Sequence, residues 1–131
     1  MKKNTKGFTL IELLAVIVIL AIIALIAVPV IMNILTKSRQ SAAEDTAYSI
    51  LNAAELYYAE ALLDNPTEAF TNTTFTFTEA GSTPALELKG TKPTAGSVVL
   101  DEDGVATISG SLTINGLTCT QDAANGTIDC Q

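Results

Sequence analysis

The sequence predicts an α+β fold, in which one long N-terminal helix packs its second half against a small antiparallel β head. Three observations predict it. Residues 13–32 are drawn almost wholly from Leu, Ile, Val and Ala. The polar sequence that follows has no Gly, and no Pro before Pro66. Beyond Pro66, Thr, Gly, Asn and Ser become frequent, and β-branched residues alternate with polar ones, which is typical of short strands and turns.

The apolar run is long enough to cross a membrane. Its twenty residues would form a helix about 30 Å long, the thickness of the hydrocarbon core of a bilayer. Lys2, Lys3 and Lys6 precede it, so we expect the N-terminus to stay cytoplasmic and the C-terminal part to lie outside. A cleaved secretory signal is the alternative, but the run is longer than an ordinary signal core and no A-x-A site follows it.

The helix is expected to continue past the apolar run and to span residues 8–63, a length of about 80 Å. Its second half is amphipathic, and the sequence Asp64-Asn65-Pro66 marks its end. We expect the tyrosines of this half, Tyr48, Tyr57 and Tyr58, to pack in the core. The apolar stripe that repeats at helical spacing consists of Ala43, Ala47, Ile50, Leu51, Ala54, Tyr58, Ala61 and Leu62.

The remaining residues, 64–131, are predicted to form the β head. The stretch "SVVLDEDGVATI" indicates a hairpin with an acidic turn, and Asn115-Gly116 indicates a turn or a bulge. We expect three or four antiparallel strands over residues 97–130. The earlier stretch "FTNTTFTFTEAGSTP" contains one short alternating segment and a loop.

Composition excludes several classes of function. Outside the first six residues the chain has four basic side chains against fourteen acidic ones, so direct nucleic-acid binding is not expected. There is no His, no Gly-rich phosphate loop and no activated nucleophile. We therefore predict that the chain is not an enzyme and that it has no catalytic residue and no cofactor. The turn at residues 101–104 lacks the ligand spacing of an EF-hand, so a solvated turn is favoured over a calcium site and no metal site is predicted.

One acidic residue, Glu12, interrupts the apolar N-terminal sequence "KGFTLIELLAVIVIL". A carboxylate at the centre of a spanning helix costs roughly 2.5–3.5 kcal/mol on insertion scales. The order of a short basic leader, Gly, Phe, "TLIE" and an apolar run resembles the class III signal of type IV pilins and pseudopilins. The resemblance covers about residues 1–35, and it makes the predicted fold pilin-like.

This resemblance implies roles for individual residues. A prepilin peptidase would cut between Gly7 and Phe8, removing the leader Met1 to Gly7, and would N-methylate Phe8. The amino group of Phe8 is then a new cation, and Glu12 would pair with that group on a neighbouring subunit, which fixes the register of assembly. The alternative for Glu12 is that its side chain snorkels to the membrane surface.

Pro29 is expected to bend the helix at residues 25–29, because it has no N–H to donate to the carbonyl of Leu25. Related pilins often loosen the helix just before such a proline and have a glycine about eight residues earlier. Ala21 stands at that position here. We therefore expect any unwinding in a filament to stay within one or two turns of Pro29.

The only two cysteines, Cys119 and Cys130, lie near the C-terminus. The predicted topology places them outside the cell, where disulfides persist. A bridge would stabilise the head by about 3 kcal/mol, and many pilins carry such a C-terminal disulfide loop. Two unpaired thiols are the alternative.

The expected function is therefore that of a structural subunit of a type IV pilus-like filament serving adhesion, motility or DNA uptake. Its expected partners are identical subunits, the prepilin peptidase and the membrane assembly platform. The precursor would be inserted in the cytoplasmic membrane, and the mature chain would lie in an extracellular or cell-surface filament. The alternatives are a pseudopilin of a type II secretion or competence system, a minor pilin at the tip, and a membrane-tethered binding protein or enzyme that never polymerises.

Overall fold

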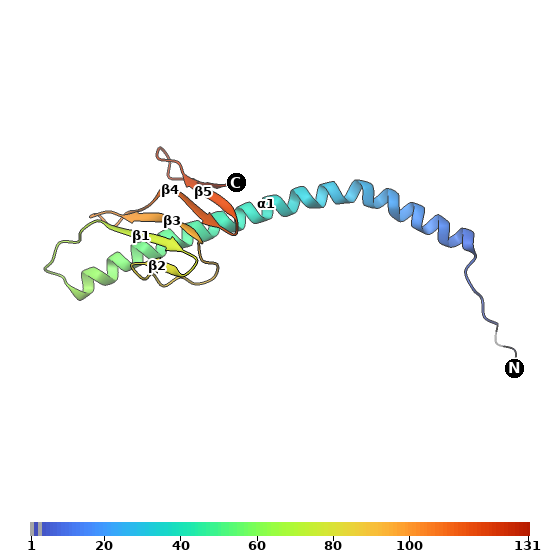
Figure 1. Cartoon of the computed structure of the whole chain (residues 1–131), viewed down its shortest axis with the longest axis horizontal. Helices are drawn as coiled ribbons and strands as arrows, with labels where there is room; N and C mark the ends of the chain where they lie inside the picture. The colour runs from blue at the N-terminus through green and yellow to red at the C-terminus, as the bar shows by residue number, and fades with distance from the viewer. Residues whose placement is uncertain (1, 3) are drawn as a thin grey trace. The chain divides into compact units, whose positions relative to one another are not determined.

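A computed structural model describes residue 2 and residues 4–131, which form one helix and one six-stranded antiparallel sheet (Figure 1). Met1 and Lys3, which belong to the predicted leader, lie outside the described residues. The chain divides into two units, Met1–Lys37 and Ser38–Gln131, and each is described by itself. The predicted α+β fold, with a long apolar N-terminal helix and an antiparallel sheet, is confirmed.

The helix α1 spans Leu10–Asp64, close to the predicted residues 8–63. It begins two residues later than expected because Thr9 caps it, as described below. Its last turn is followed by Asn65, whose backbone N–H donates to the carbonyl of Ala61 at 3.1 Å. Pro66 then prevents a further turn, because the residue before a proline avoids the helical conformation.

The sheet has the strand order β2-β1-β3-β4-β5-β6. Four of its strands lie in the predicted region 97–130, except that the first of them begins two residues earlier, at Ala95, and the alternating segment near residue 75 is β1. The strand β2 was not predicted, because three residues show no alternation. The strands are β1 (Thr73–Thr78), β2 (Gly81–Thr83), β3 (Ala95–Leu100), β4 (Ala106–Ile114), β5 (Leu117–Gln121) and β6 (Ile128–Cys130). Asn115 and Gly116, with φ of 52° and 79°, form the predicted two-residue turn between β4 and β5.

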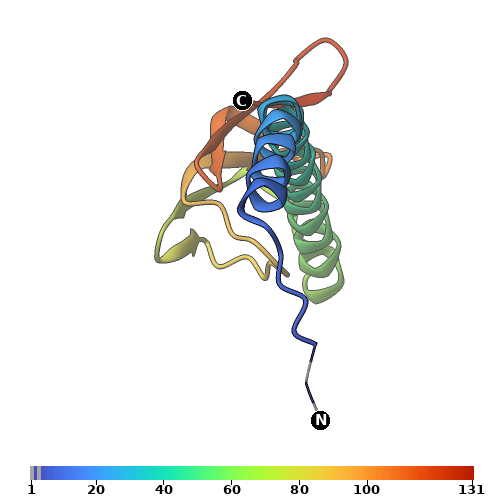
Figure 2. The same ribbon diagram turned by 90° about the vertical axis from the view of Figure 1, so that its right-hand side faces the viewer.

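In the unit Ser38–Gln131, one face of the sheet packs on the second half of α1 (Figures 1 and 2). Three alanines of the helix are completely buried there, and their small side chains allow the sheet to lie close to the helix. The predicted stripe is confirmed except at its end, where Leu62 is 38% exposed. The core residues from the helix are Ala43, Ala47, Ile50, Leu51 and Ala54, and those from the sheet include Phe75, Phe77, Val98, Leu100, Ile108, Leu112, Ile114 and Ile128.

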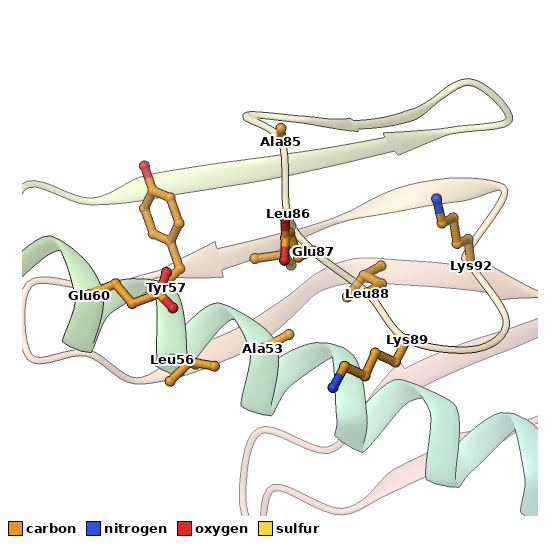
Figure 3. Close-up of a pocket in the computed structure, with 10 residues that line it drawn as sticks. All are labelled: Ala53, Leu56, Tyr57, Glu60, Ala85, Leu86, Glu87, Leu88, Lys89 and Lys92. Atoms are coloured by element: carbon orange, nitrogen blue, oxygen red, sulfur yellow. The ribbon is translucent and has the colours of Figure 1, made fainter.

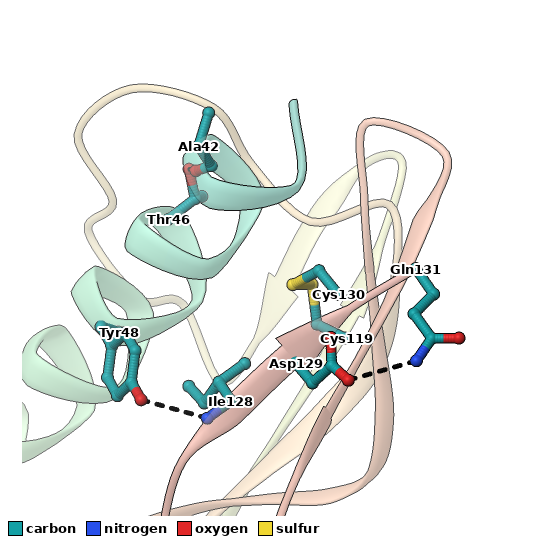
Figure 4. Close-up of a disulfide and its surroundings, with 8 residues drawn as sticks. All are labelled: Ala42, Thr46, Tyr48, Cys119, Ile128, Asp129, Cys130 and Gln131. Carbon is teal, nitrogen blue, oxygen red and sulfur yellow. Dashed lines mark hydrogen bonds between the residues drawn. A yellow bond between two sulfur atoms is a disulfide. The ribbon is translucent and has the colours of Figure 1, made fainter. Parts of the chain in front are cut away.

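The three tyrosines differ in their roles. Tyr57 meets Phe75 edge-to-face, with ring centroids 5.2 Å apart, and Tyr58 meets Phe70 in the same way at 4.9 Å. These two pack against the core as predicted. Tyr48 does not, because it is 41% exposed. Its hydroxyl instead accepts a hydrogen bond of 3.0 Å from the backbone N–H of Ile128 (Figure 4), which ties β6 to the helix.

Cys119 and Cys130 form a disulfide between β5 and β6 (Figure 4). The two residues lie directly opposite each other in the strand register and are fully buried. Beyond them, Gln131 and Thr118 exchange backbone hydrogen bonds of 3.0 and 2.9 Å. The C-terminus is therefore held by a disulfide and by backbone hydrogen bonds that extend to Gln131.

The acidic turn between β3 and β4 is ordered by its own first residue and by the helix. One oxygen of Asp101, Oδ1, accepts hydrogen bonds from the backbone N–H groups of Asp103 (3.0 Å) and Val105 (2.8 Å). Gly104 has a φ of +84°, and a Cβ added there would overlap the ring of Tyr58. Only glycine satisfies both conditions, because other residues are strained at this φ and would displace the ring.

We predict that Gly104→Ala destabilises the protein more than Gly110→Ala. Both glycines have positive φ, but a Cβ at Gly110 would meet no atom within 4 Å. Gly110→Ala should therefore cost about 1–2 kcal/mol for the backbone alone, and Gly104→Ala should cost about 1–3 kcal/mol more for the overlap with Tyr58. Urea unfolding of the oxidised full-length protein in detergent would measure both. Equal losses would mean that the turn does not pack on Tyr58.

Candidate functional site

The predicted cleavage junction lies in irregular, exposed chain before the helix. Residues 4–9 have no regular secondary structure, and the side chain of Phe8 is 84% exposed. A protease binds its substrate most readily in such a segment, because no helix has to unfold first. The position of the Gly7–Phe8 bond is thus compatible with cleavage.

Nothing within the described chain requires glycine at position 7. A Cβ built on Gly7 would meet no atom within 4 Å, and its φ lies outside the positive range that favours glycine. A requirement for glycine here would therefore come from a binding partner that approaches the backbone closely.

Thr9 and Glu12 form a capping box at the start of α1. Glu12 Oε2 accepts a hydrogen bond of 2.8 Å from the backbone N–H of Thr9 and one of 3.0 Å from the Thr9 hydroxyl. In return, the backbone N–H of Glu12 donates to Thr9 Oγ1 at 3.3 Å. These bonds satisfy backbone donors that the first turn of a helix leaves without partners.

The capping role of Thr9 was not predicted from the sequence. Glu12 was interpreted through a partner on another subunit or through snorkelling to the membrane surface, although the pattern Thr-x-x-Glu before an apolar run is itself a signal for a capping box. Both residues follow the predicted cut, so the cap would be kept in the mature chain. All the hydrogen bonds that the carboxylate accepts use Oε2, and Oε1 accepts none from residue 2 or residues 4–131.

The first half of α1 presents an apolar surface on every side. Each Leu, Ile and Val from Leu10 to Leu35 is at least 47% exposed. The helix is long and apolar enough to cross a membrane. A helix that is apolar all round needs lipid or other apolar helices as its surroundings, and this surface is far larger than the apolar patches of soluble monomers.

Pro29 lies inside α1, and the helical assignment is unbroken from Leu10 to Asp64. The absent N–H leaves the carbonyl of Leu25 without its usual donor. The predicted bend at residues 25–29 stays a prediction.

The described part of the chain gives little support for a metal site or a nucleophilic cysteine. Residue 2 and residues 4–131 contain no group of three or more His, Cys, Asp or Glu residues that could hold a metal ion. In the turn at 101–104, Asp101 uses Oδ1 on backbone N–H groups. Both cysteines are bonded to each other, so neither is a free nucleophile.

Comparison with known proteins gives one match. Residues 2–28 match the family model described as the prokaryotic N-terminal methylation motif. No curated protein and no solved structure matches the chain.

The matched segment contains Gly7, Phe8, the Thr9–Glu12 capping box and most of the apolar run. The long apolar helix and antiparallel sheet have a pilin-like layout. The predicted resemblance is therefore confirmed: at residues 2–28 the chain carries the N-terminal methylation motif, the class III signal peptide of type IV pilin-like proteins.

Proposed function

We propose that this chain is a structural subunit of a type IV pilus-like filament, assembled by packing the N-terminal hydrophobic helices of identical subunits. The observation that carries the proposal is the apolar surface of residues 10–35, which directly follows the cleavage motif. Lipid covers such a surface before assembly, and neighbouring helices cover it in a filament core. The function is structural and needs no cofactor and no catalytic residue.

The proposed life cycle has three steps. The precursor is inserted in the cytoplasmic membrane, with the leader of residues 1–7 on the cytoplasmic side. Prepilin peptidase cuts between Gly7 and Phe8 and N-methylates Phe8. The assembly platform then moves the subunit from the membrane into an extracellular or cell-surface filament, which serves adhesion, motility or DNA uptake.

In the filament, Glu12 of one subunit pairs with the Phe8 amino group of its neighbour. The capping box supports this role, because Thr9 binds one carboxylate oxygen and leaves Oε1 for a second partner. A charge enters an apolar bundle at tolerable cost only when it is paired and hydrogen-bonded. The helix bends at residues 25–29. Any unwinding stays within one or two turns of Pro29, because position 21 is Ala21 and not a glycine that would help the helix to unwind.

We predict that the mature chain begins at Phe8. Mass spectrometry of the N-terminal peptide from cell-surface protein should find Phe8 first, carrying one methyl group on its amino nitrogen. Gly7→Leu should block this cleavage because the peptidase, not the fold, requires the glycine. A mature N-terminus beyond Met32 would instead identify an ordinary secretory signal.

Glu12→Gln separates the two roles of the Glu12 side chain. Glutamine serves in a capping box, so the helix start should be kept while the charge is lost. We expect both Glu12→Gln and Glu12→Ala to insert in the membrane and to assemble at least about tenfold less filament than wild type, the effect of 1.4 kcal/mol per subunit addition. Thr9→Val, which removes the two hydroxyl bonds of the capping box but keeps the charge, is the matched control and should assemble better than either. If Glu12→Gln assembles as wild type does, capping rather than charge pairing is the role of Glu12.

Electron microscopy of sheared cell-surface fractions tests the proposed function itself. We expect long filaments that contain this chain, identified by an antibody to residues 38–131. Short fibres that appear only with an overproduced secretion system would identify a pseudopilin. A chain that stays in the membrane as a monomer would overturn the proposal.

A further inference from the structure

A cavity of about 740 Å³ lies between the second half of α1 and the segment that joins β2 to β3 (Figure 3). Both apolar and charged side chains line it. Leu56 and Tyr57 line it from the helix, and Leu86 and Leu88 line it from the connecting segment. Leu56 is 60% exposed, so the apolar wall of the cavity is open to a partner.

The two lysines that line the cavity lie together at one of its ends. Lys89 and Lys92 lie at one end, Glu60 lies at the other, and Glu87 lies between them (Figure 3). The unit Ser38–Gln131 has thirteen acidic side chains and only three basic ones, of which these lysines are two. Their end of the cavity therefore offers two cations to an acidic group, on a unit whose other charged side chains are nearly all acidic.

The acidic turn of residues 101–103 has the properties of a group that would bind there. Glu102 and Asp103 are exposed, so both carboxylates are available to a partner. The backbone that carries them is fixed by the hydrogen bonds of Asp101 and by the close packing of Gly104 on Tyr58. A surface that is ordered before binding loses little conformational entropy in the complex.

We propose that, in the filament, the acidic turn of one subunit docks on the lysine end of the cavity of a second copy. This proposal rests on the proposed function, because it needs identical subunits in an ordered array. The turn and the cavity share no residue, so the contact is head-to-tail, and a head-to-tail contact that does not close into a ring propagates as a helix. The turn packs on Tyr58, towards the Glu60 end of the cavity, and the lysines lie at the opposite end. Subunits stacked in parallel therefore bring unlike charges together.

A single exposed ion pair contributes only about 0–1 kcal/mol. A filament repeats the contact at every subunit, and placing like charges opposite each other is more costly than losing the pair. Charge reversal is therefore a sharper test than neutralisation, and the contact should weaken as salt concentration rises.

The test uses the full-length chain and three variants. Lys89→Glu with Lys92→Glu reverses the charge at the lysine end of the cavity. Glu102→Lys with Asp103→Lys reverses the charge of the acidic turn, and the third variant combines all four changes. Each reversal alone should lower the amount of sheared filament about tenfold or more. The combined variant should restore it, because every subunit then presents exchanged charges. Glu68→Lys with Glu79→Lys, which makes the same change of charge at exposed acids outside the turn, should assemble as wild type does.

Equal membrane levels and an oxidised Cys119–Cys130 pair show that each variant folds. If a reversal variant does not fold, Lys89→Gln with Lys92→Gln replaces it, and its filaments should be fewer and less sensitive to salt than wild type. Wild-type assembly by reversed or neutralised variants overturns the contact, and so does a combined variant that stays defective. Absence of filaments from wild type itself contradicts the proposed function instead, so the two failures are distinguishable.

Discussion

The apolar surface of residues 10–35 has to be covered by something other than this chain, and that need governs the first half of the molecule. The side chains there are exposed on all sides of the helix, which is unfavourable in water by about 25 cal/mol for each Å². Lipid and a bundle of identical helices are both apolar surroundings. A segment with this composition can therefore pass from one to the other without a large change in hydrophobic free energy, as a subunit that leaves a membrane for a filament must do.

The second half of the helix meets the opposite condition, because it has its own partner in the same chain. Ala43, Ala47 and Ala54 are fully buried under the sheet, so the helix packs closely against the sheet there. Tyr48, Tyr57 and Tyr58 contact three different parts of the head, namely β6, β1 and the segment before β1. The first half of the helix thus needs apolar surroundings from outside the chain, whereas the second half is a core element of the head.

Much of the fold could be predicted because its signals are local. The apolar run, the stripe from Ala43 to Ala54, the Asn115-Gly116 turn and the acidic hairpin are all patterns within a few residues. The strand β2 could not be predicted, since three residues carry no period. Tyr48 was misplaced because the backbone group that it binds, the N–H of Ile128, lies 80 residues away in the sequence. The packing of Gly104 on Tyr58 is a contact of the same long-range kind. At the candidate site, the roles of Gly7, Phe8 and Glu12 are predictions from a family resemblance, whereas the role of Thr9 follows from a local Thr-x-x-Glu capping pattern.

The edge strands of the sheet, β2 and β6, are only three residues long each. An exposed edge has unpaired N–H and C=O groups that can join another sheet, and short edges reduce this risk. The proposed filament would hold many identical heads at very high local concentration, where merging of neighbouring sheets would compete with ordered growth. In such a filament, the brevity of β2 and β6 would protect the subunits from an amyloid-like side reaction that crowding would otherwise favour.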